Sequence, residues 1–178
     1  MRKFAIERDA MTAVHGIIVH QTNSPTATST LNGYQRPKAN GAHFLIDRDG
    51  TIYQTASLYK QTWHAGWLKS RCVLEKRCAP SKFNPIREHK REVVKSAPDR
   101  FPSNEDSIGI EIVGEALPRG TAVVDEKKVY ESVNDAQNNS LKWLVSGLTT
   151  TLGVPLHEIF RHPTISRKNL TEASTAKW

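Results

Sequence analysis

Apolar residues follow a short period in four parts of the chain. Aliphatic and β-branched residues alternate or run together over residues 15–20, 42–46, 51–54 and 107–114, which is typical of strands with at least one buried face. The second and third runs are separated by a turn ending in Asp-Gly, and this pair predicts a hairpin because glycine tolerates a positive φ. We therefore expect these runs to be strands of a sheet.

The apolar period lengthens from residue 135 onward. Five aliphatic residues lie at i, i+3, i+4, i+7 and i+11 and predict a helix that ends at Gly153 and Pro155: Leu141, Leu144, Val145, Leu148 and Leu152. Residues 159–162 form a brief final strand or loop before a polar tail. This order of elements predicts an α/β (α+β) fold with a central mixed β-sheet flanked by helices, as a single domain over residues 1–178.

Most of the net positive charge lies in one segment. The chain carries a formal net charge of +7, and residues 69–100 hold ten basic and four acidic residues, a net of +6. This segment contains three prolines, which indicates an insertion into the domain. It also contains both cysteines, Cys72 and Cys78, which could close a small disulfide loop or stay as two thiols.

A basic chain usually has an anionic partner, such as nucleic acid, a membrane or the cell wall. The sequence shows no recognition helix and no basic-glycine-aromatic pattern, so we expect no nucleic acid. No run of about 18 apolar residues is present, which excludes a transmembrane helix. Glu7 and Asp9 precede any apolar stretch, so the N-terminus lacks the pattern of a signal peptide. We therefore expect synthesis to finish in the cytoplasm.

Two of the seven histidines, His20 and His162, end short apolar runs, where side chains converge at one edge of a sheet. A catalytic zinc site needs three protein ligands, and a carboxylate can be the third. Glu172 follows His162 by ten residues, within reach of a loop that folds back. Position alone favours ordinary structural histidines, so a metal site needs a more specific signal.

Five ordered motifs supply that signal. They are Ile-Ile-Val-His20, Ala-His43-Phe-Leu-Ile-Asp-Arg-Asp-Gly-Thr-Ile-Tyr-Gln, Trp-His64-Ala-Gly, Ser-Ile-Gly-Ile-Glu111-Ile-Val-Gly and Arg-His162-Pro-Thr-Ile-Ser-Arg-Lys. Together they resemble the zinc-dependent N-acetylmuramoyl-L-alanine amidases of the peptidoglycan-recognition and phage-lysozyme type, closest to bacterial members with a glutamate base. The resemblance covers residues 16–177 except the basic segment, and it implies a mixed sheet with zinc in a groove that holds the glycan and its stem peptide.

The resemblance also implies a role for each matching residue. His20 and His162 become zinc ligands, and Glu172 becomes the third ligand, although the family uses Asp or Cys there. Ala42 stands where some members have a tyrosine base, so Glu111 becomes the general base. Lys168, with Arg167 as the alternative, becomes the group that steadies the oxyanion.

The remaining matches concern the substrate. The resemblance implies that the groove is lined by His43, His64 and Trp63. Trp67 is a second aromatic residue that could stack on a sugar. The implied reaction is hydrolysis of the amide between the lactyl group of N-acetylmuramic acid and L-alanine, with Zn2+ as cofactor. The alternative is a non-catalytic peptidoglycan-binding module, as in relatives that have lost a ligand.

We expect the basic segment to border the groove and to attract the polyanionic wall or an acidic inhibitor (immunity) protein. Three settings fit a chain of this kind. It could be an antibacterial effector that a specialised secretion system carries to periplasmic peptidoglycan, a lysin released at lysis, or a cytoplasmic amidase that recycles wall fragments.

Overall fold

A five-stranded mixed sheet forms the centre of the chain. The computed structural model describes residues 4–80 and 84–178, and the strands of this sheet follow the order β4-β3-β6-β2-β9. Strand β6 lies parallel to both β2 and β3, β9 lies parallel to β2, and β4 is the antiparallel partner of β3. Their bounds are Gly16–Gln21 for β2, Phe44–Ile46 for β3, Ile52–Gln54 for β4, Ser107–Ile112 for β6 and Ile159–Arg161 for β9. The predicted mixed sheet and the Asp-Gly hairpin are confirmed.

Two small antiparallel pairs accompany the central sheet, and the sequence pattern predicted neither. One joins β1 (Glu7–Ala10) to β5 (Lys60–Thr62), and the other joins β7 (Ala116–Leu117) to β8 (Val129–Tyr130). The short helices are α1 (Ala27–Gly33), α2 (Arg71–Leu74), α3 (Pro85–Glu92) and α5 (His162–Ile165), with 3-10 turns at Asp125–Lys127 and Leu156–Glu158.

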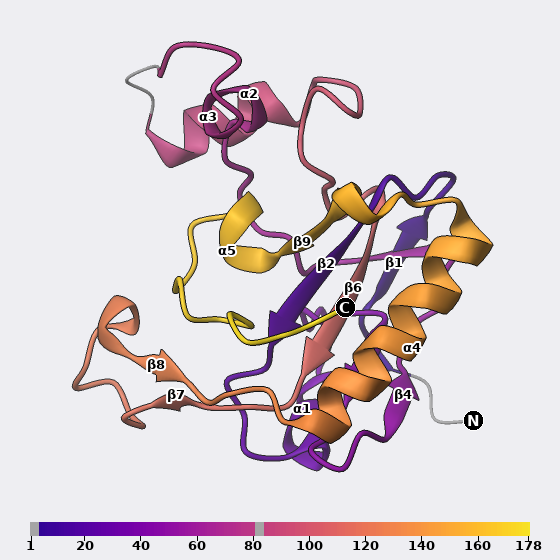
Figure 1. The fold of residues 1–178 in the computed structure, drawn as a ribbon, viewed down its shortest axis with the longest axis vertical. Coiled ribbons are helices and arrows are strands. Elements are labelled where there is room, and N and C mark those ends of the chain that lie inside the picture. Colours follow the sequence, from indigo (N-terminus) through magenta and orange to yellow (C-terminus); the bar gives the residue numbers. More distant parts are fainter. Residues whose placement is uncertain (1–3, 81–83) are drawn as a thin grey trace.

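The long helix α4 (Asp135–Leu152) covers one face of the sheet, as its apolar stripe predicted (Figure 1). Asn134 and Gln137 form a capping box at its start, and Gly153, at a φ of 70°, ends it in the left-handed conformation. Its stripe packs against the residues of β2 and β6 that point to this side, in a core that includes Ile17, Val19, Ile108, Ile110, Ile112, Leu141, Leu144, Val145 and Leu148.

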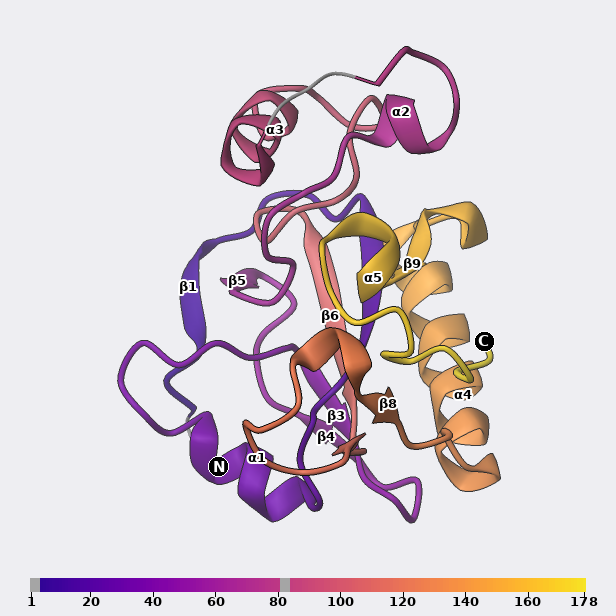
Figure 2. The same ribbon diagram turned by 90° about the vertical axis from the view of Figure 1, so that its left-hand side faces the viewer.

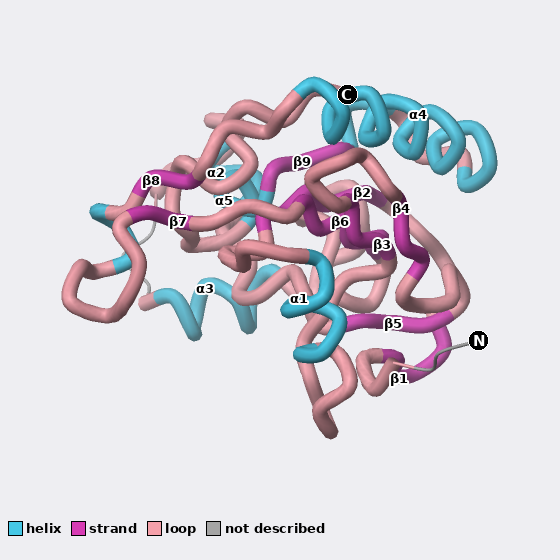
Figure 3. The backbone as a smooth tube through the Cα atoms, turned by 90° about the horizontal axis from the view of Figure 1, so that it is seen from below, coloured by secondary structure: helices cyan, strands magenta, loops and turns pink. Residues whose placement is uncertain are grey.

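On the opposite face of the sheet, the described residues form no helix of comparable length. Figure 3 shows α1 and α3 on the side of the strands away from α4. Two smaller apolar clusters lie on this face, one built around Leu45 and α1, the other around Ile18, Leu68 and Ile165. The side chains expected to do chemistry also lie on this face.

The basic segment forms α2 and α3 and lies beyond one end of the sheet, at the top of Figures 1 and 2. Two buried ion pairs hold it to the core. Arg71 forms a forked pair with Glu158, with Nη2 2.6 Å from Oε1 and Nη1 2.9 Å from Oε2. Arg100 pairs with Asp106 in the same way, with Nη2 2.8 Å from Oδ2. Part of the charge excess is therefore neutralised inside the protein.

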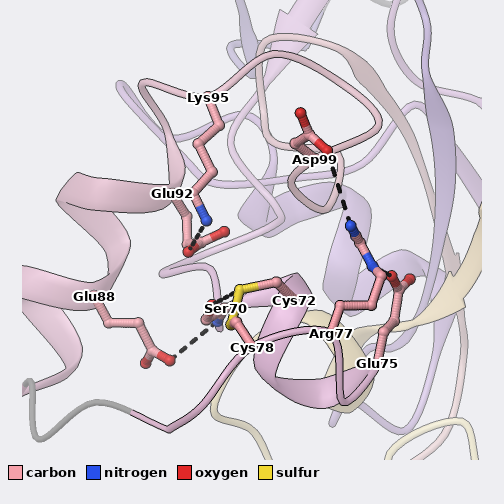
Figure 4. Close-up of a disulfide and its surroundings, with 9 residues drawn as sticks. All are labelled: Ser70, Cys72, Glu75, Arg77, Cys78, Glu88, Glu92, Lys95 and Asp99. Carbon is pink, nitrogen blue, oxygen red and sulfur yellow. Dashed lines mark hydrogen bonds and ion pairs between the residues drawn. A yellow bond between two sulfur atoms is a disulfide. The ribbon is translucent and has the colours of Figure 1, made fainter.

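Cys72 and Cys78 form a disulfide with an S–S distance of 2.07 Å, which decides between the two alternatives left open by the sequence (Figure 4). Beside it, Glu88 of α3 accepts a hydrogen bond from the backbone N–H of Ser70 at 3.0 Å. Glu88 also forms an ion pair with Arg167, so α3 is tied to the loop that follows α5.

Across the described residues, we find no helix with the length and apolar character that crossing a membrane requires.

Candidate active site and metal centre

The parallel strands bring the candidate residues to one edge of the sheet. His20 lies near the end of β2, and the parallel register places it directly beside Glu111 of β6. His162 follows β9 immediately as the first residue of α5. Ligands of open sheets commonly bind at the carboxyl ends of parallel strands, and all three residues lie there.

His20, His162 and Glu172 form a buried group of three potential ligands. Glu172 Oε1 lies 2.9 Å from His162 Nδ1 and 3.6 Å from His20 Nδ1, and the three donor atoms all lie within 4.8 Å of one another. Ligand atoms of a tetrahedral zinc ion are separated by roughly 3.3 Å, given bonds of about 2.0 to 2.2 Å. Two imidazole nitrogens and one carboxylate oxygen are also a donor set that zinc accepts, so these residues fit the metal.

The protonation states of two of these residues favour metal binding. Burial and the neighbouring His162 lower the pKa of His20 to about 4, although Glu172 opposes this shift. Burial alone would raise the pKa of Glu172, but the adjacent imidazoles of His162 and His20 more than offset it and lower the pKa to about 2. A neutral imidazole and an ionised carboxylate are the forms that bind a metal ion.

Glu172 reaches the site because the C-terminal tail is fixed around it. The backbone N–H of Ala173 donates to Gln21 Oε1 at 3.0 Å, and Ala173 adopts a left-handed φ of 52°. Arg161 donates to the carbonyls of Ala173 and Ala176 at 2.9 and 2.7 Å. The sharp turn at Ala173 gives the longer glutamate side chain the backbone approach that it needs.

Glu111 faces the same space and carries an unusual protonation state. Burial and the charge of Glu172 raise its pKa to about 8, while Lys168 opposes the shift. Its Oε2 is inaccessible to water and has no hydrogen-bond partner among the described residues. A cation placed at the three donor atoms would lower this pKa, because it would favour the charged form.

The cavity in front of these residues has a volume of about 700 Å³. Lys168 lines it, whereas Arg167 is paired with Glu88, so the structure separates the two residues between which the sequence did not decide. Trp63 and Trp67 also line the cavity and are 47% and 52% exposed. The guanidinium of Arg8 lies 4.6 Å from the ring centroid of Trp63.

His64 and His43 occupy different positions, although the sequence grouped them. His64 lines the cavity, and its Nδ1 lies 3.0 Å from His20 Nε2. His43 is fully buried behind it and does not line the cavity. Its Nε2 donates to the Lys60 carbonyl at 2.9 Å, and its Nδ1 accepts the N–H of Gly109 at 3.0 Å. His43 therefore links β5 to β6 through its two ring nitrogens, and it lies outside the lining of this cavity.

Several cavity residues had no signal in the sequence. Tyr34, which caps α1, accepts a hydrogen bond from the backbone N–H of Ala42 at 3.3 Å, so a tyrosine hydroxyl lies beside the position that lacks the tyrosine of some amidases. Tyr130 enters from β8, Asp125 from the connection between β7 and β8, and His89 from α3. His89 brings the basic segment to the cavity wall.

Comparisons with known proteins identify the family of the chain and relatives that share its fold. In a scan against protein-family models, residues 10–175 match the family described as N-acetylmuramoyl-L-alanine amidase. A search of curated proteins gave no match.

Several solved structures are similar to the chain. The catalytic domain of XlyA is 22% identical with a TM-score of 0.55, over 93% of this chain and 81% of that one. A selenomethionine derivative of AmpD is 20% identical with a TM-score of 0.55, over 96% and 87%. AmpDh3 from Pseudomonas aeruginosa, in complex with anhydromuramic pentapeptide, is 19% identical with a TM-score of 0.60, over 94% and 60%. At these identities the likeness shows a shared fold.

Proposed function

The chain belongs to the N-acetylmuramoyl-L-alanine amidase family, and from this premise we propose how its residues act on peptidoglycan. Such an amidase hydrolyses the amide bond between the lactyl group of N-acetylmuramic acid and L-alanine of the stem peptide. The observation that carries the proposal is the parallel register of β2 and β6. In this register Glu111 lies beside His20, which belongs to the group of three potential ligands, His20, His162 and Glu172.

His20, His162 and Glu172 hold a zinc ion in this proposal. Bound there, zinc supplies Lewis-acid chemistry, polarising the amide carbonyl and lowering the pKa of a nearby water. The support is the chemistry of the donor set, since one nitrogen of each imidazole and one carboxylate oxygen converge within 4.8 Å and all three side chains are buried.

Glu111 acts as the general base and then as the general acid. Its carboxylate removes a proton from the attacking water and returns a proton to the nitrogen of L-alanine as the amide breaks. Burial favours the protonated form of Glu111 and a cation held by the three ligands would favour the ionised form, so the opposing effects suit a group that both takes up and releases a proton. Lys168, exposed at the wall, places a positive charge where the carbonyl oxygen becomes negative.

The cavity holds the substrate through its aromatic walls. Trp63 and Trp67 are half exposed and can stack on a sugar ring or on the stem peptide. AmpDh3, which shares the fold, was solved with anhydromuramic pentapeptide. A muropeptide of that chemical class is the substrate that we propose here.

The test is digestion of defined muropeptides by the zinc-loaded protein, followed by mass spectrometry. We expect release of a stem peptide with a free L-alanine amino group, loss of release on zinc removal, and its return when zinc is added back. Glu111→Gln should abolish release while still binding zinc. If the zinc-loaded protein releases no stem peptide, or Glu111→Gln releases it at the wild-type rate, the catalytic assignment is wrong. Wall binding that persists without cleavage would instead support a binding module.

We propose that the protein acts on periplasmic peptidoglycan, because disulfides such as Cys72–Cys78 persist mainly in oxidising compartments. Directed to the periplasm of a host cell, the protein should cause lysis, and the same protein kept in the cytoplasm should not. Lack of lysis in the periplasm, together with a preference for soluble fragments over intact sacculi, would support a recycling amidase.

A further inference from the structure

The segment Trp63-His64-Ala65-Gly66 touches both histidines of the metal group. His162 Nε2 lies 3.1 Å from the backbone carbonyl oxygen of Ala65. A carbonyl only accepts hydrogen bonds, so His162 Nε2 donates to Ala65, and Nδ1 is the nitrogen that faces Glu172. The preceding residue, His64, makes the corresponding contact with His20 through its side chain.

The contact between His64 and His20 joins two imidazoles, so its direction depends on a third group. His64 Nε2 lies 3.3 Å from the hydroxyl oxygen of Ser107. The Ser107 hydroxyl already donates its one hydrogen in a short hydrogen bond to the Ser103 carbonyl. Towards His64 it can therefore only accept, which places the proton of His64 on Nε2 and leaves Nδ1 as an acceptor.

We infer that His64, oriented by Ser107, is a positioning residue that fixes the tautomer of His20. With an acceptor at His64 Nδ1, the proton of His20 lies on Nε2, and His20 Nδ1 is the unprotonated nitrogen that faces Glu172. The opposite tautomer would protonate Nδ1 and remove a ligand. The inference rests on the metal site of the proposed function, and it assigns His64 a task in addition to lining the cavity.

The packing around His64 supports a fixed ring position. The backbone N–H groups of His64 and Ala65 both donate to Asn104 Oδ1, at 2.8 and 2.7 Å. The ring itself lies against Gly109, where an added Cβ would stand 2.8 Å from its Cγ and Nδ1. Only glycine at this position of β6 lets the ring lie where it reaches both Ser107 and His20.

The test compares two substitutions that separate ring volume from hydrogen bonding. His64→Phe keeps a ring over Gly109 but removes the acceptor. His64→Asn is smaller but keeps an acceptor oxygen as many bonds from the backbone as Nδ1. Zinc affinity is measured by competition with a chromophoric chelator, on proteins whose circular dichroism matches the wild type.

We expect His64→Phe to weaken zinc binding by about 10- to 100-fold and His64→Asn to stay within about threefold of the wild type. Equal loss in the two variants, or no loss in His64→Phe, would overturn the inference. If the wild type itself binds no zinc, the proposed function fails at its metal site, and a measurement without metal still decides the tautomer.

That measurement is the long-range ¹H–¹⁵N correlation spectrum of the imidazoles in the metal-free protein. In the wild type we expect His20 protonated at Nε2 and unprotonated at Nδ1. Ser107→Ala, which removes the acceptor for His64, should shift His20 towards a mixture of tautomers. A wild-type His20 protonated at Nδ1, or a Ser107→Ala spectrum identical to the wild type, would refute the role of this hydrogen-bonded chain.

Discussion

Replacing Glu111 with glutamine should stabilise the metal-free protein while abolishing its activity. Burial and Glu172 raise the pKa of Glu111 from 4.5 to about 8. A carboxyl group whose folded pKa lies above its unfolded pKa stabilises the fold fully below the unfolded value. That stability is lost as the pH rises towards the folded value, because the unfolded state ionises first. Glutamine mimics the protonated group at every pH and avoids this loss.

The magnitude follows from the width of that pH window. Each pH unit between the two pKa values contributes about 1.4 kcal/mol, so the variant should exceed the wild type by at most about 3 kcal/mol at pH 7. Water in the cavity screens the charge, which lowers the expected gain to between about 1 and 3 kcal/mol. The gain should be close to zero near pH 4.5, grow up to about pH 8 and stay constant above it.

The assay is urea unfolding of both proteins in the presence of a chelator at pH 5, 6, 7 and 8. Glu131→Gln is a control of opposite sign, because hydrogen bonds from the Glu115 backbone and from Arg48 lower the pKa of Glu131. That variant should be less stable than the wild type at pH 7. Added zinc should shrink the gain of Glu111→Gln, since a nearby cation favours the ionised carboxylate. A pH-independent difference between Glu111→Gln and the wild type would refute the reasoning.

Three further predictions concern the metal group, the buried ion pair and the basic segment. Zinc at a free concentration 100 times its dissociation constant should raise the free energy of unfolding by about 2.7 kcal/mol. Glu172→Ala should abolish this gain in urea unfolding, and an undiminished gain would exclude Glu172 as a ligand. Arg71→Met should cost about 3 to 5 kcal/mol, because it leaves the Glu158 carboxylate buried and unpaired, and Arg71→Met combined with Glu158→Leu should recover most of the loss. An equally destabilised double variant in the same assay would contradict this. Lys76→Glu with Lys90→Glu should reduce cosedimentation with intact sacculi at low salt and leave zinc affinity unchanged. Lys142→Glu, a single charge reversal on α4 outside this segment, should bind sacculi as the wild type does. Equal binding by the wild type and both variants would exclude a role for the basic segment.

Much of the fold could be predicted because its signals are local. The alternation of Ile108, Ile110 and Ile112 identified β6, and the leucine stripe identified α4. The two strand pairs β1–β5 and β7–β8 were not predicted, because their strands are short and partly exposed and therefore show no alternation of apolar residues. The anchoring of the basic segment by Arg71 and Arg100 could not be predicted either, since their partners Glu158 and Asp106 lie outside that segment.

The candidate site was predicted from the sequence motifs and, for Glu172, from its separation of ten residues from His162. The structure brings His20, His162 and Glu172 together, with Glu111 and Lys168 around the same cavity. His43 does not line this cavity. It immediately precedes β3, and the alternation of apolar residues in that strand does not decide whether the side chain of such a flanking residue points to the cavity or into the core. Tyr34, Tyr130 and Asp125 arrive from a helix cap and a hairpin whose positions depend on tertiary packing.

Strand alternation also gives the Ser-Ile-Gly-Ile-Glu motif a physical meaning. Its isoleucines face α4 in the main core, and the residues that alternate with them, Ser107, Gly109 and Glu111, face the site. On that face Ser107 orients the His64 ring, Gly109 leaves the space that the ring occupies, and Glu111 lies beside His20. Because the side-chain period of a strand is two, a one-residue shift in register would exchange these two sets of residues. The packing of the isoleucines under α4 therefore holds the site residues in register, and the stability of the core and the geometry of the metal group depend on the same strand.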